Sequence, residues 1–404
     1  MKLDINTIRE NFPIFRHRAY LDTACYAPTC LKVSKAVEDW WESRSSISAP
    51  SFEQTYDWLQ PIADARTDAS KLINASEDEI TFITSTGLGL NKIASAIPMG
   101  KGDNIVLNDL DFSTNIVPWL AQRQRGVEIR RVKHRNGKLY LEDFEKMVNS
   151  HTKVIAISSV QWTTGFRVDL GALVKLAEAN DAYVVVDTMQ SLGALEFDVR
   201  KTGIHFMVAQ GYKWLFGPFA TGILFCRRDL IDKYEPLIAE PANVLKNPKK
   251  ESYMHEPSLD NLTDYDFGFV PTAARYQSCS NISGLWGLGA ALKYINLLGI
   301  SNIEERVQNL VEYLVQGLKK IPNIKIVSPI ERECRSGIVV FTYGSVESDL
   351  KMMEQLSKLG VGVSVRYTAG CGGIRVSCHF YNNEEDLDKL FSGLKGHRKL
   401  LSFH

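Results

Sequence analysis

The sequence predicts an α/β protein built on a mainly parallel β-sheet, followed by a smaller α+β unit. Short β-branched runs alternate with longer helical patterns through the middle of the chain, as a parallel sheet with crossover helices requires. Two of these runs, 153–160 (KVIAISSV) and 182–187 (AYVVVD), are almost continuously apolar, as expected of strands that are covered on both faces. Near residue 285 the order changes to long helices and then closely spaced strands, which indicates the second unit.

The large sheet is predicted from its β-branched runs in chain order. These runs are 79–84, 104–108, 153–160, 182–187, 205–209 and 221–226. Between the two most apolar runs, residues 169–180 place Leu170, Leu173, Leu176 and Ala177 on one face of a helix that Asp169 can cap. This strand–helix–strand order predicts a βαβ unit.

The second unit begins with a helical pattern over 284–320 that Gly299 interrupts. The elements predicted after it are strands at 324–328, 337–343, 361–366 and 373–379 and helices at 348–359 and 383–395. A chain of 404 residues fits two domains at about 150 residues each. We therefore expect a large domain over 1–285, whose N-terminal segment can pack with the other unit, and a small domain over 286–404. The polar stretch 240–270 shows no clear period and is predicted as a long loop.

Composition and charge narrow the functional classes. The 47 basic residues balance the 47 acidic ones, which leaves no positive field for nucleic acid or anionic lipid. No apolar run reaches the roughly 18 residues that cross a bilayer, and the charged start is not that of a signal peptide, so a cytoplasmic protein is expected. The seven cysteines form no C-x-x-C pair and have no histidine at ligand spacing. They predict reduced thiols and no metal site.

Three groups that can carry chemistry follow predicted strands. Asp187 ends one apolar strand, and Lys213 comes shortly after the next, in Gln210-Gly211-Tyr212-Lys213-Trp214. Ligands bind at this carboxyl edge of open α/β sheets. Upstream, Thr86-Gly87 follows strand 79–84 and leads into a helix whose free N–H groups suit a phosphate. Taken alone, a lysine after a strand is usually a surface residue, an aspartate at a strand end is usually a cap, and a Thr-Gly pair is usually a turn. Their order along the chain is what predicts a shared site.

One ligand, pyridoxal 5′-phosphate (PLP), explains the three features together. Lys213 would link covalently to the cofactor, Asp187 would keep the ring nitrogen protonated, and the Thr86-Gly87 turn would hold the phosphate. A charged hydrogen bond of the kind expected from Asp187 contributes about 1.5–3 kcal/mol. The residues therefore predict a PLP enzyme.

The chain resembles the fold type I PLP enzymes of the class V aminotransferase superfamily, which includes cysteine desulfurases, selenocysteine lyases, kynureninases and isopenicillin N epimerase-like proteins. Besides the stretch from Asp187 to Lys213, the segments that carry the resemblance are AYLDTACYAPTC (19–30), DFSTNIVPW (111–119), SSVQWTTGFRVDL (158–170), RSGIVVFTY (335–343) and IRVSCHFYNNEEDLDKL (374–390). The resemblance covers nearly the whole chain. It implies a three-layer architecture around a mainly parallel seven-stranded sheet.

The resemblance also implies roles for individual residues. Lys213 is implied as the catalytic lysine, and Arg375 as the arginine that pairs with the α-carboxylate of a small amino acid. The residues implied to bind the cofactor are Thr86, Gly87, Phe112, Asp187, Gln190, Gln210, Tyr212 and Ser280. Phe112 would stack on the ring, and Ser280 would reach the phosphate of the other subunit, so the resemblance implies a homodimer with its site at the interface.

The reaction type stays open because this chain departs from the desulfurase pattern. Phe112 replaces a histidine and cannot exchange a proton, while Tyr212 and Gln210 also replace the usual residues. Cys371 follows Arg366 at the spacing of the desulfurase nucleophile, but Arg375 comes so soon afterwards that the flexible loop is missing.

These departures favour a class V aminotransferase in which Lys213 removes the α-proton, although the same base also serves elimination and epimerisation. A desulfurase or C–S or C–C lyase, an epimerase-like racemase, and a non-catalytic sulfur carrier or structural homologue remain alternatives, with Cys371 as the possible nucleophile. A set of aromatic residues is expected to shape the side-chain pocket: Tyr26, Trp162, Tyr276 and Tyr367.

Overall fold

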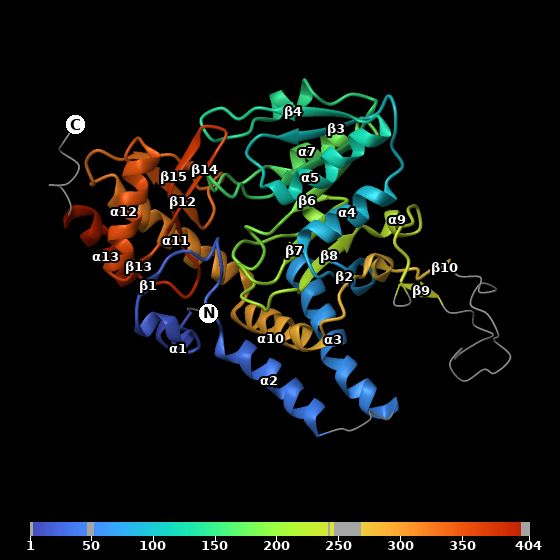
Figure 1. Ribbon diagram of the computed structural model, residues 1–404, viewed down its shortest axis with the longest axis horizontal. Helices are drawn as coiled ribbons and strands as arrows, with labels where there is room; N and C mark the ends of the chain where they lie inside the picture. The colour runs from blue at the N-terminus through green and yellow to red at the C-terminus, as the bar shows by residue number, and fades with distance from the viewer. Residues whose placement is uncertain (1–2, 47–51, 241–242, 246–267, 397–404) are drawn as a thin grey trace.

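The computed structural model describes residues 3–46, 52–240, 243–245 and 268–396. Its larger sheet has seven strands in the order β2-β8-β7-β6-β5-β3-β4, and the five from β7 to β4 run parallel. Their bounds are β2 Ile80–Phe82, β3 Asn104–Asn108, β4 Glu128–Val132, β5 Thr152–Ser158, β6 Tyr183–Asp187, β7 Phe206–Gln210 and β8 Gly222–Cys226. The predicted α/β class with a mainly parallel seven-stranded sheet is confirmed (Figure 1).

One strand of this sheet has no counterpart among the predicted β-branched runs. Strand β4 (EIRRV) lies at the edge of the sheet, where polar and partly exposed side chains are tolerated. Because β4 is charged, it contains no apolar run from which a strand could be predicted. At the opposite edge β8 and β2 are antiparallel to their neighbours.

Helices on both faces give the sheet its layers. Helix α7 (Leu170–Glu178) begins after Asp169, whose side chain accepts a hydrogen bond from Ala172 N at 3.1 Å, as the sequence predicts. The other helices of this unit are α4 Thr86–Ala96, α5 Val117–Leu120, α6 Leu141–Glu145, α8 Val199–Thr202 and α9 Arg228–Ile231.

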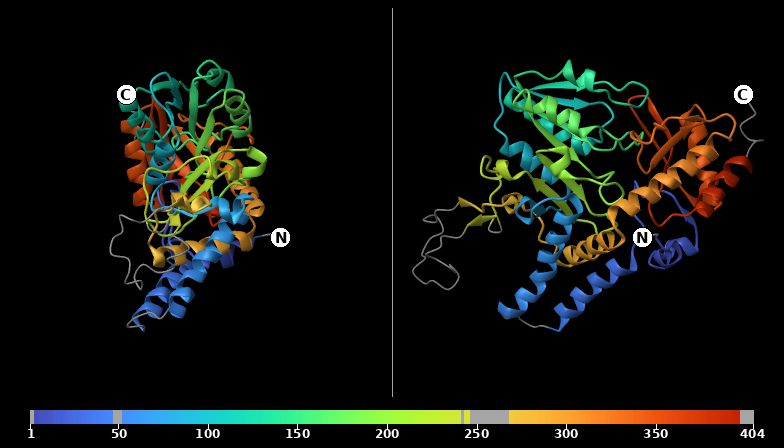
Figure 2. Two further views of the ribbon diagram at one scale, coloured as in Figure 1. Left: turned by 90° about the vertical axis from the view of Figure 1, so that its right-hand side faces the viewer. Right: turned by 180° about the vertical axis from the view of Figure 1, so that it is seen from behind.

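Long helices connect the two units. The predicted break at Gly299 is present, where φ is +80° and α10 (Ile282–Leu298) gives way to α11 (Ile300–Leu318). Helix α10 packs against α2 (Leu31–Ser45) and α3 (Phe52–Ile73), and Figure 2 shows α11 continuing from α10 toward the C-terminal unit. Because α10 begins before residue 285, the chain passes the expected boundary within a helix, and the division at 285/286 stays a prediction.

The smaller unit is built on a four-stranded antiparallel sheet in the order β11-β12-β15-β14. Its strands and helices are β11 Lys325–Ile326, β12 Ile338–Thr342, β14 Ser364–Thr368, β15 Cys371–Ser377, α12 Val346–Lys358 and α13 Glu384–Gly396. After α1 (Ile5–Glu10), strand β1 (Ala19–Tyr20) pairs in parallel with β13 (Val361–Gly362). The N-terminal segment is thereby attached to the C-terminal unit.

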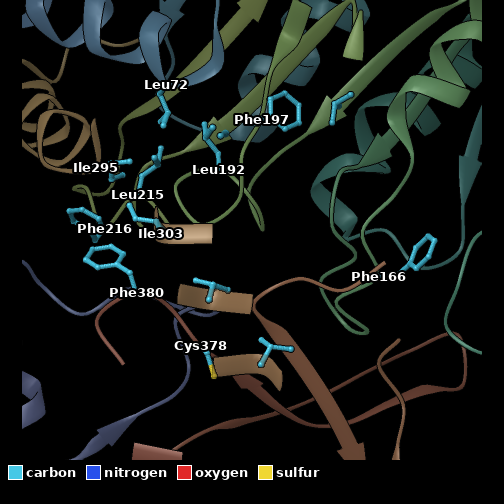
Figure 3. Packing of buried hydrophobic residues seen from close by; sticks show 14 of the residues in the cluster. Leu72, Phe166, Leu192, Phe197, Leu215, Phe216, Ile295, Ile303, Cys378 and Phe380 are labelled. Carbon is cyan, nitrogen blue, oxygen red and sulfur yellow. The ribbon is translucent and has the colours of Figure 1, made fainter. Parts of the chain in front are cut away.

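A shared apolar core fastens the units to each other. Phe216, just after Lys213 in the chain, packs edge-on against Phe380 with ring centroids 5.8 Å apart (Figure 3). Beside them, His379 Nε2 lies 2.8 Å from the carbonyl oxygen of Trp214. The loop that carries Lys213 is therefore held against the segment that follows β15.

Most of the predicted loop 240–270 lies outside the described residues. Its described ends form a short antiparallel ladder between β9 (Val244–Leu245) and β10 (Gly268–Phe269). In the described part of the chain, no helix combines the length and apolar character needed to cross a membrane.

Candidate active site

The candidate site lies where β5, β6 and β7 end. Parallel pairing sets Ser158 beside Asp187, and Asp187 beside Val208, so the three strands finish at one edge. Gln210 is the last residue of β7, and Lys213 follows in the next turn. The register of the sheet thus brings together the carboxylate and the amine that lie apart in sequence.

Asp187 and Lys213 have pKa values that move toward each other. Burial raises the pKa of Asp187, whose Oδ1 accepts a hydrogen bond from Met189 N at 2.8 Å. Burial lowers the pKa of Lys213, and the positive charge of Arg375 lowers it further, while Asp187 opposes both effects. An uncharged amine is therefore accessible closer to neutral pH than for an ordinary lysine.

Phe112 lies near Lys213, and the turn that carries it is fixed by Asp111, a buried acid that was not predicted from the sequence. The Phe112 ring centroid is 5.9 Å from Lys213 Nζ, and its edge meets Trp162 at 5.2 Å between centroids. Asp111 accepts hydrogen bonds from Ser158 N at 3.0 Å and from the Asn108 side chain at 2.5 Å. Burial raises the pKa of Asp111 to about 7. Its only sequence signal is its place after strand β3.

The first turn of α4 provides the features of an anion cradle. Ser85 caps the helix by accepting from Leu88 N at 3.1 Å, which leaves the amides of Thr86 and Gly87 without intrahelical acceptors. Among the described residues, the buried Thr86 Oγ1 has no hydrogen-bond partner. A Cβ built on Gly87 would already stand 3.4 Å from Thr114 Cγ2. An unpaired buried hydroxyl beside a helix N-terminus fits a phosphate group.

Gln190 and Gln210 are tied to the framework of the site. The buried Gln190 donates to the carbonyl oxygen of Ala24 at 3.2 Å and accepts from Trp214 Nε1 at 2.8 Å. Gln210 Nε2 donates to the carbonyl oxygen of Thr84 at 3.1 Å, just before the cradle. Both residues lie at the predicted edge, and their contacts with a cofactor stay predictions.

Tyr212 and Ser280 face different surroundings. The Tyr212 ring stacks on Phe219 at 4.5 Å and lies 5.6 Å from Tyr26, and its ring centroid is 5.9 Å from Lys213 Nζ. Ser280 is exposed at the start of α10, and no hydrogen bond joins it to Thr86 or Lys213 in the described structure. The contact of Ser280 with a second subunit stays a prediction.

Arg375 reaches the site from the small unit. This arginine is 2% exposed on β15 and donates to the carbonyl oxygen of Trp162 at 3.1 Å and to Asp22 Oδ1 at 3.3 Å. Its Nε has no partner in the described part of the chain. Burial lowers the pKa of Arg375 and, in the same cluster, raises that of Asp22. A buried guanidinium with a free donor can take up a carboxylate.

Cys371, the nucleophile that the sequence offered as an alternative, is held away from this cluster. It pairs with Thr368 across a tight hairpin whose turn residues, Ala369 and Gly370, have φ of +48° and +76°. Burial raises its pKa, and the charges that act on it are those of Lys325 and Asp109. A Cβ on Gly137 would stand 3.2 Å from its sulfur. The thiol therefore sits in a strand against the 134–137 turn.

The four aromatic residues that were expected to line one side-chain pocket lie in different parts of the structure. Trp162 meets Phe112 and Tyr26 meets Tyr212, so both belong to the site. Tyr276 is instead fully buried against Phe206, and Tyr367 donates to Asp349 Oδ2 at 2.6 Å. The expectation is wrong for Tyr276, because bulk alone does not distinguish a core side chain from a pocket wall.

Fold and site together define a class. A lysine with a lowered pKa, a buried acid beside it, and an anion cradle at one edge of a fold type I sheet are the parts of a PLP-dependent enzyme. The chain matches the family model for aminotransferase class-V over residues 19–390. It belongs to the aminotransferase class-V family, and PLP is the cofactor of this class.

Relatives in this family are similar over nearly their whole length. The chain is 28% identical to a probable cysteine desulfurase of Methanothermobacter thermautotrophicus, covering 95% of each protein. It is also 28% identical to a cysteine desulfurase of Klebsiella pneumoniae, over 99% of this chain and 100% of that one.

Solved structures show the same fold. The cysteine desulfurase CsdA of Escherichia coli matches with a TM-score of 0.83 at 21% identity, covering 98% of both chains. The cystine C–S lyase C-DES, solved with its product cysteine persulfide, matches with a TM-score of 0.84 at 20% identity, over 95% of this chain and 98% of that one.

No group of residues suited to a metal ion occurs in the described part of the chain.

Proposed function

We propose that this protein uses PLP to cleave the Cβ–S bond of a small sulfur-containing amino acid, with cysteine as the substrate to test first. The observation that carries the proposal is that Lys213 follows β7, the strand paired with the one that ends at Asp187, so that the charges of Asp187 and of the buried Arg375 both act on its amine. This arrangement suits α-proton chemistry on an amino acid. The choice of a sulfur substrate draws on the curated relatives, which are named cysteine desulfurases.

Each residue has a separate task in this proposal. PLP, when bound, withdraws electrons from the α-carbon of the substrate. Lys213 Nζ takes the α-proton, and its lowered pKa makes the neutral amine available for that transfer. Arg375 binds the α-carboxylate through the guanidinium edge that carries the unpartnered Nε.

The phosphate would be held by Thr86 Oγ1 and by the amides of Thr86 and Gly87 at the start of α4. We infer that Ser280 of a second copy completes this cradle, because Ser280 is exposed on its own chain. Tyr26 and Phe219, exposed by 51% and 61%, form an apolar surface beside Tyr212 that a second subunit would cover. The active form would therefore be a homodimer.

Phe112 cannot take part in proton transfer at the α-carbon of the substrate. Its ring offers an apolar platform 5.9 Å from Lys213 Nζ and has no titratable atom. Proton transfer at the α-carbon is thereby left to Lys213.

The test is to incubate the PLP-loaded protein with L-cysteine and to measure sulfide, pyruvate and alanine. We expect loss of sulfur from the substrate, with either pyruvate or alanine as the carbon product. Lys213→Ala should lower the rate on the order of a thousandfold, because it removes the base. Lys201→Ala, on α8, provides a matched control.

Other products would assign another reaction. A 2-oxo acid that keeps its sulfur would instead show the transamination that the sequence favoured, and D-cysteine would show racemisation. Absence of sulfur release from both cysteine and cystine would overturn the proposal.

A further inference from the structure

Cys25 is the thiol that the fold brings to the candidate site. It lies in the turn after β1, where its backbone N–H donates to the carbonyl oxygen of Asp22 at 2.9 Å. The pairing of β1 with β13 and the bridge between Asp22 and Ser377 hold this turn against β15. The N-terminal segment is thus placed beside the strand that carries Arg375.

A guanidinium group contacts the sulfur directly. Arg366 Nη2, on β14, donates to Cys25 Sγ at 3.4 Å, and Nη1 donates to the carbonyl oxygen of Val365 at 2.8 Å. No ion pair joins Arg366 to a carboxylate within the described ranges of the chain. This contact fixes the sulfur beside a cationic group of the C-terminal unit.

The same thiol lies within the electrostatic reach of the groups proposed to bind substrate. Burial lowers the pKa values of Lys213 and Arg375, and the sulfur of Cys25 lies close enough to both that its thiolate form would oppose that lowering. Arg375 is 2% exposed, and its Nε has no partner among the described residues. This buried, unpartnered donor can bind an anionic group, and the substrate carboxylate assigned to it above would place the substrate in the cluster that contains Cys25.

Cys371 has none of these relationships. The charges that act on it belong to Lys325 and Asp109, and its strand begins directly after the two-residue turn of the hairpin. Movement of its sulfur toward Lys213 would require the β14–β15 pairing to open.

We propose that Cys25 is the residue that accepts the sulfur atom of the substrate, an inference that rests on the proposed C–S cleavage. The Cys25 thiolate attacks the substrate sulfur, so that a new S–S bond forms and the Cβ–S bond breaks. The electron pair of the broken bond stays with the substrate carbon, which takes up the proton that the substrate thiol loses. Cysteine becomes alanine and Cys25 becomes a persulfide.

This step is balanced without an external oxidant, because the transferred sulfur is oxidised by two electrons while the carbon is reduced by two. A dithiol in solution then reduces the persulfide, which releases sulfide, restores Cys25 and leaves the dithiol as a disulfide. The direct alternative, β-elimination without a protein thiol, yields pyruvate, ammonia and sulfide instead. The carbon product therefore distinguishes the two routes.

The experiment uses the PLP-loaded protein and L-cysteine, first without a dithiol. We expect a mass increase of one sulfur atom on the peptide that carries Cys25, and alanine in equal amount. With a dithiol present, Cys25→Ala and Cys25→Ser should each lower alanine formation on the order of a hundredfold or more. Cys334→Ala is the matched control, because Cys334 is also partly exposed and has its own carbonyl bound by Arg167 N, outside the site.

Thiol reactivity provides a readout that does not depend on turnover. We expect iodoacetamide to modify Cys25 faster in the wild-type protein than in Arg366→Gln, because the variant lacks the cation at Sγ. Thermal unfolding and cofactor absorbance of each variant establish that it is folded and loaded.

The inference would be overturned by cysteine turnover that persists in folded Cys25→Ala, by pyruvate as the only carbon product, or by a persulfide on Cys371 alone. Failure of the wild-type protein to release any sulfur would instead count against the proposed function itself.

Discussion

At the scale of single residues, buried polar atoms without partners show where a ligand belongs. A buried hydroxyl that makes no hydrogen bond destabilises a fold by about 1–3 kcal/mol, so its retention needs a reason. Thr86 Oγ1 is such an atom at the start of α4, and Arg375 Nε is another at the opposite side of the site. A phosphate and a carboxylate would satisfy them.

Replacing Thr86 should separate cofactor binding from stability. Thr86→Val keeps the shape of the side chain but removes the hydroxyl, so we expect the apoprotein to be at least as stable as the wild type. Loss of a charged hydrogen bond worth about 1.5–3 kcal/mol should weaken PLP binding by about 10- to 100-fold.

The measurement is a titration of the apoprotein with PLP, followed by absorbance, together with denaturant unfolding. Thr81→Val is the control, because Thr81 Oγ1 is also buried without a partner but lies within β2. Equal weakening in both variants would argue against a phosphate cradle at Thr86.

At the scale of elements, a buried histidine helps to join the strands that carry the site. His205 precedes β7, and its Nδ1 accepts a hydrogen bond from Val184 N on β6 at 3.0 Å. Burial lowers the pKa of His205 to about 3, and the charge of Arg227 acts in the same direction. The half-exposed Glu178 carboxylate, 3.7 Å from Nε2, is itself bound by Arg227. The neutral ring is thus part of the fold.

Stability should therefore decrease in acid through this histidine. The folded-state pKa of about 3 lies below the ordinary value of 6.5, so the unfolded chain binds the extra proton between these two pH values. In this window His205 lowers the free energy of unfolding by about 1.4 kcal/mol for each pH unit of acidification. His205→Asn can still accept from Val184 N but cannot titrate there.

Denaturant unfolding of wild type and His205→Asn at several pH values measures the two slopes. We expect the free energy of unfolding of the variant to fall less steeply with acidification in this window, by the equivalent of one proton. Parallel curves for the two proteins would mean that His205 is already charged in the folded state.

At the scale of the whole molecule, the site is assembled from segments across the entire chain. Cys25 comes from the N-terminal segment, Lys213 from the large sheet, and Arg366 and Arg375 from the C-terminal unit. The packing of Phe216 against Phe380 holds the last two parts together. Ser280 adds the expectation that a second chain contributes as well.

Mixed dimers test whether Ser280 acts across the interface. In a dimer of one Lys213→Ala chain and one Ser280→Ala chain, the site that keeps Lys213 receives the intact serine only from its partner. We expect this site to bind PLP as tightly as wild type, whereas the Ser280→Ala homodimer binds it about tenfold more weakly.

Differently tagged chains allow the mixed dimer to be purified, and a PLP titration measures its affinity. Weak binding in the mixed dimer would show that Ser280 acts within its own chain, and a monomer in sedimentation analysis would overturn the shared site.

The sequence by itself determined six of the seven strands of the large sheet, the break at Gly299 and the cap at Asp169, because these depend on local periodicity and on the chemistry of single residues. It also placed Asp187, Lys213 and Thr86 at one edge of the sheet, since parallel strands bring the residues at their carboxyl ends together, and the roles of these residues stay predictions. The polar edge strand β4 was missed because an exposed strand needs no apolar run.

Only the tertiary structure distinguished between the cysteines. Its spacing from Arg366 made Cys371 the candidate nucleophile in the sequence, but the β14–β15 hairpin fixes that thiol away from Lys213. Cys25 has no motif of its own, and it reaches Arg366 because β1 pairs with a strand from the other end of the chain. Contacts between residues so distant in sequence depend on how the units pack, which no local pattern records.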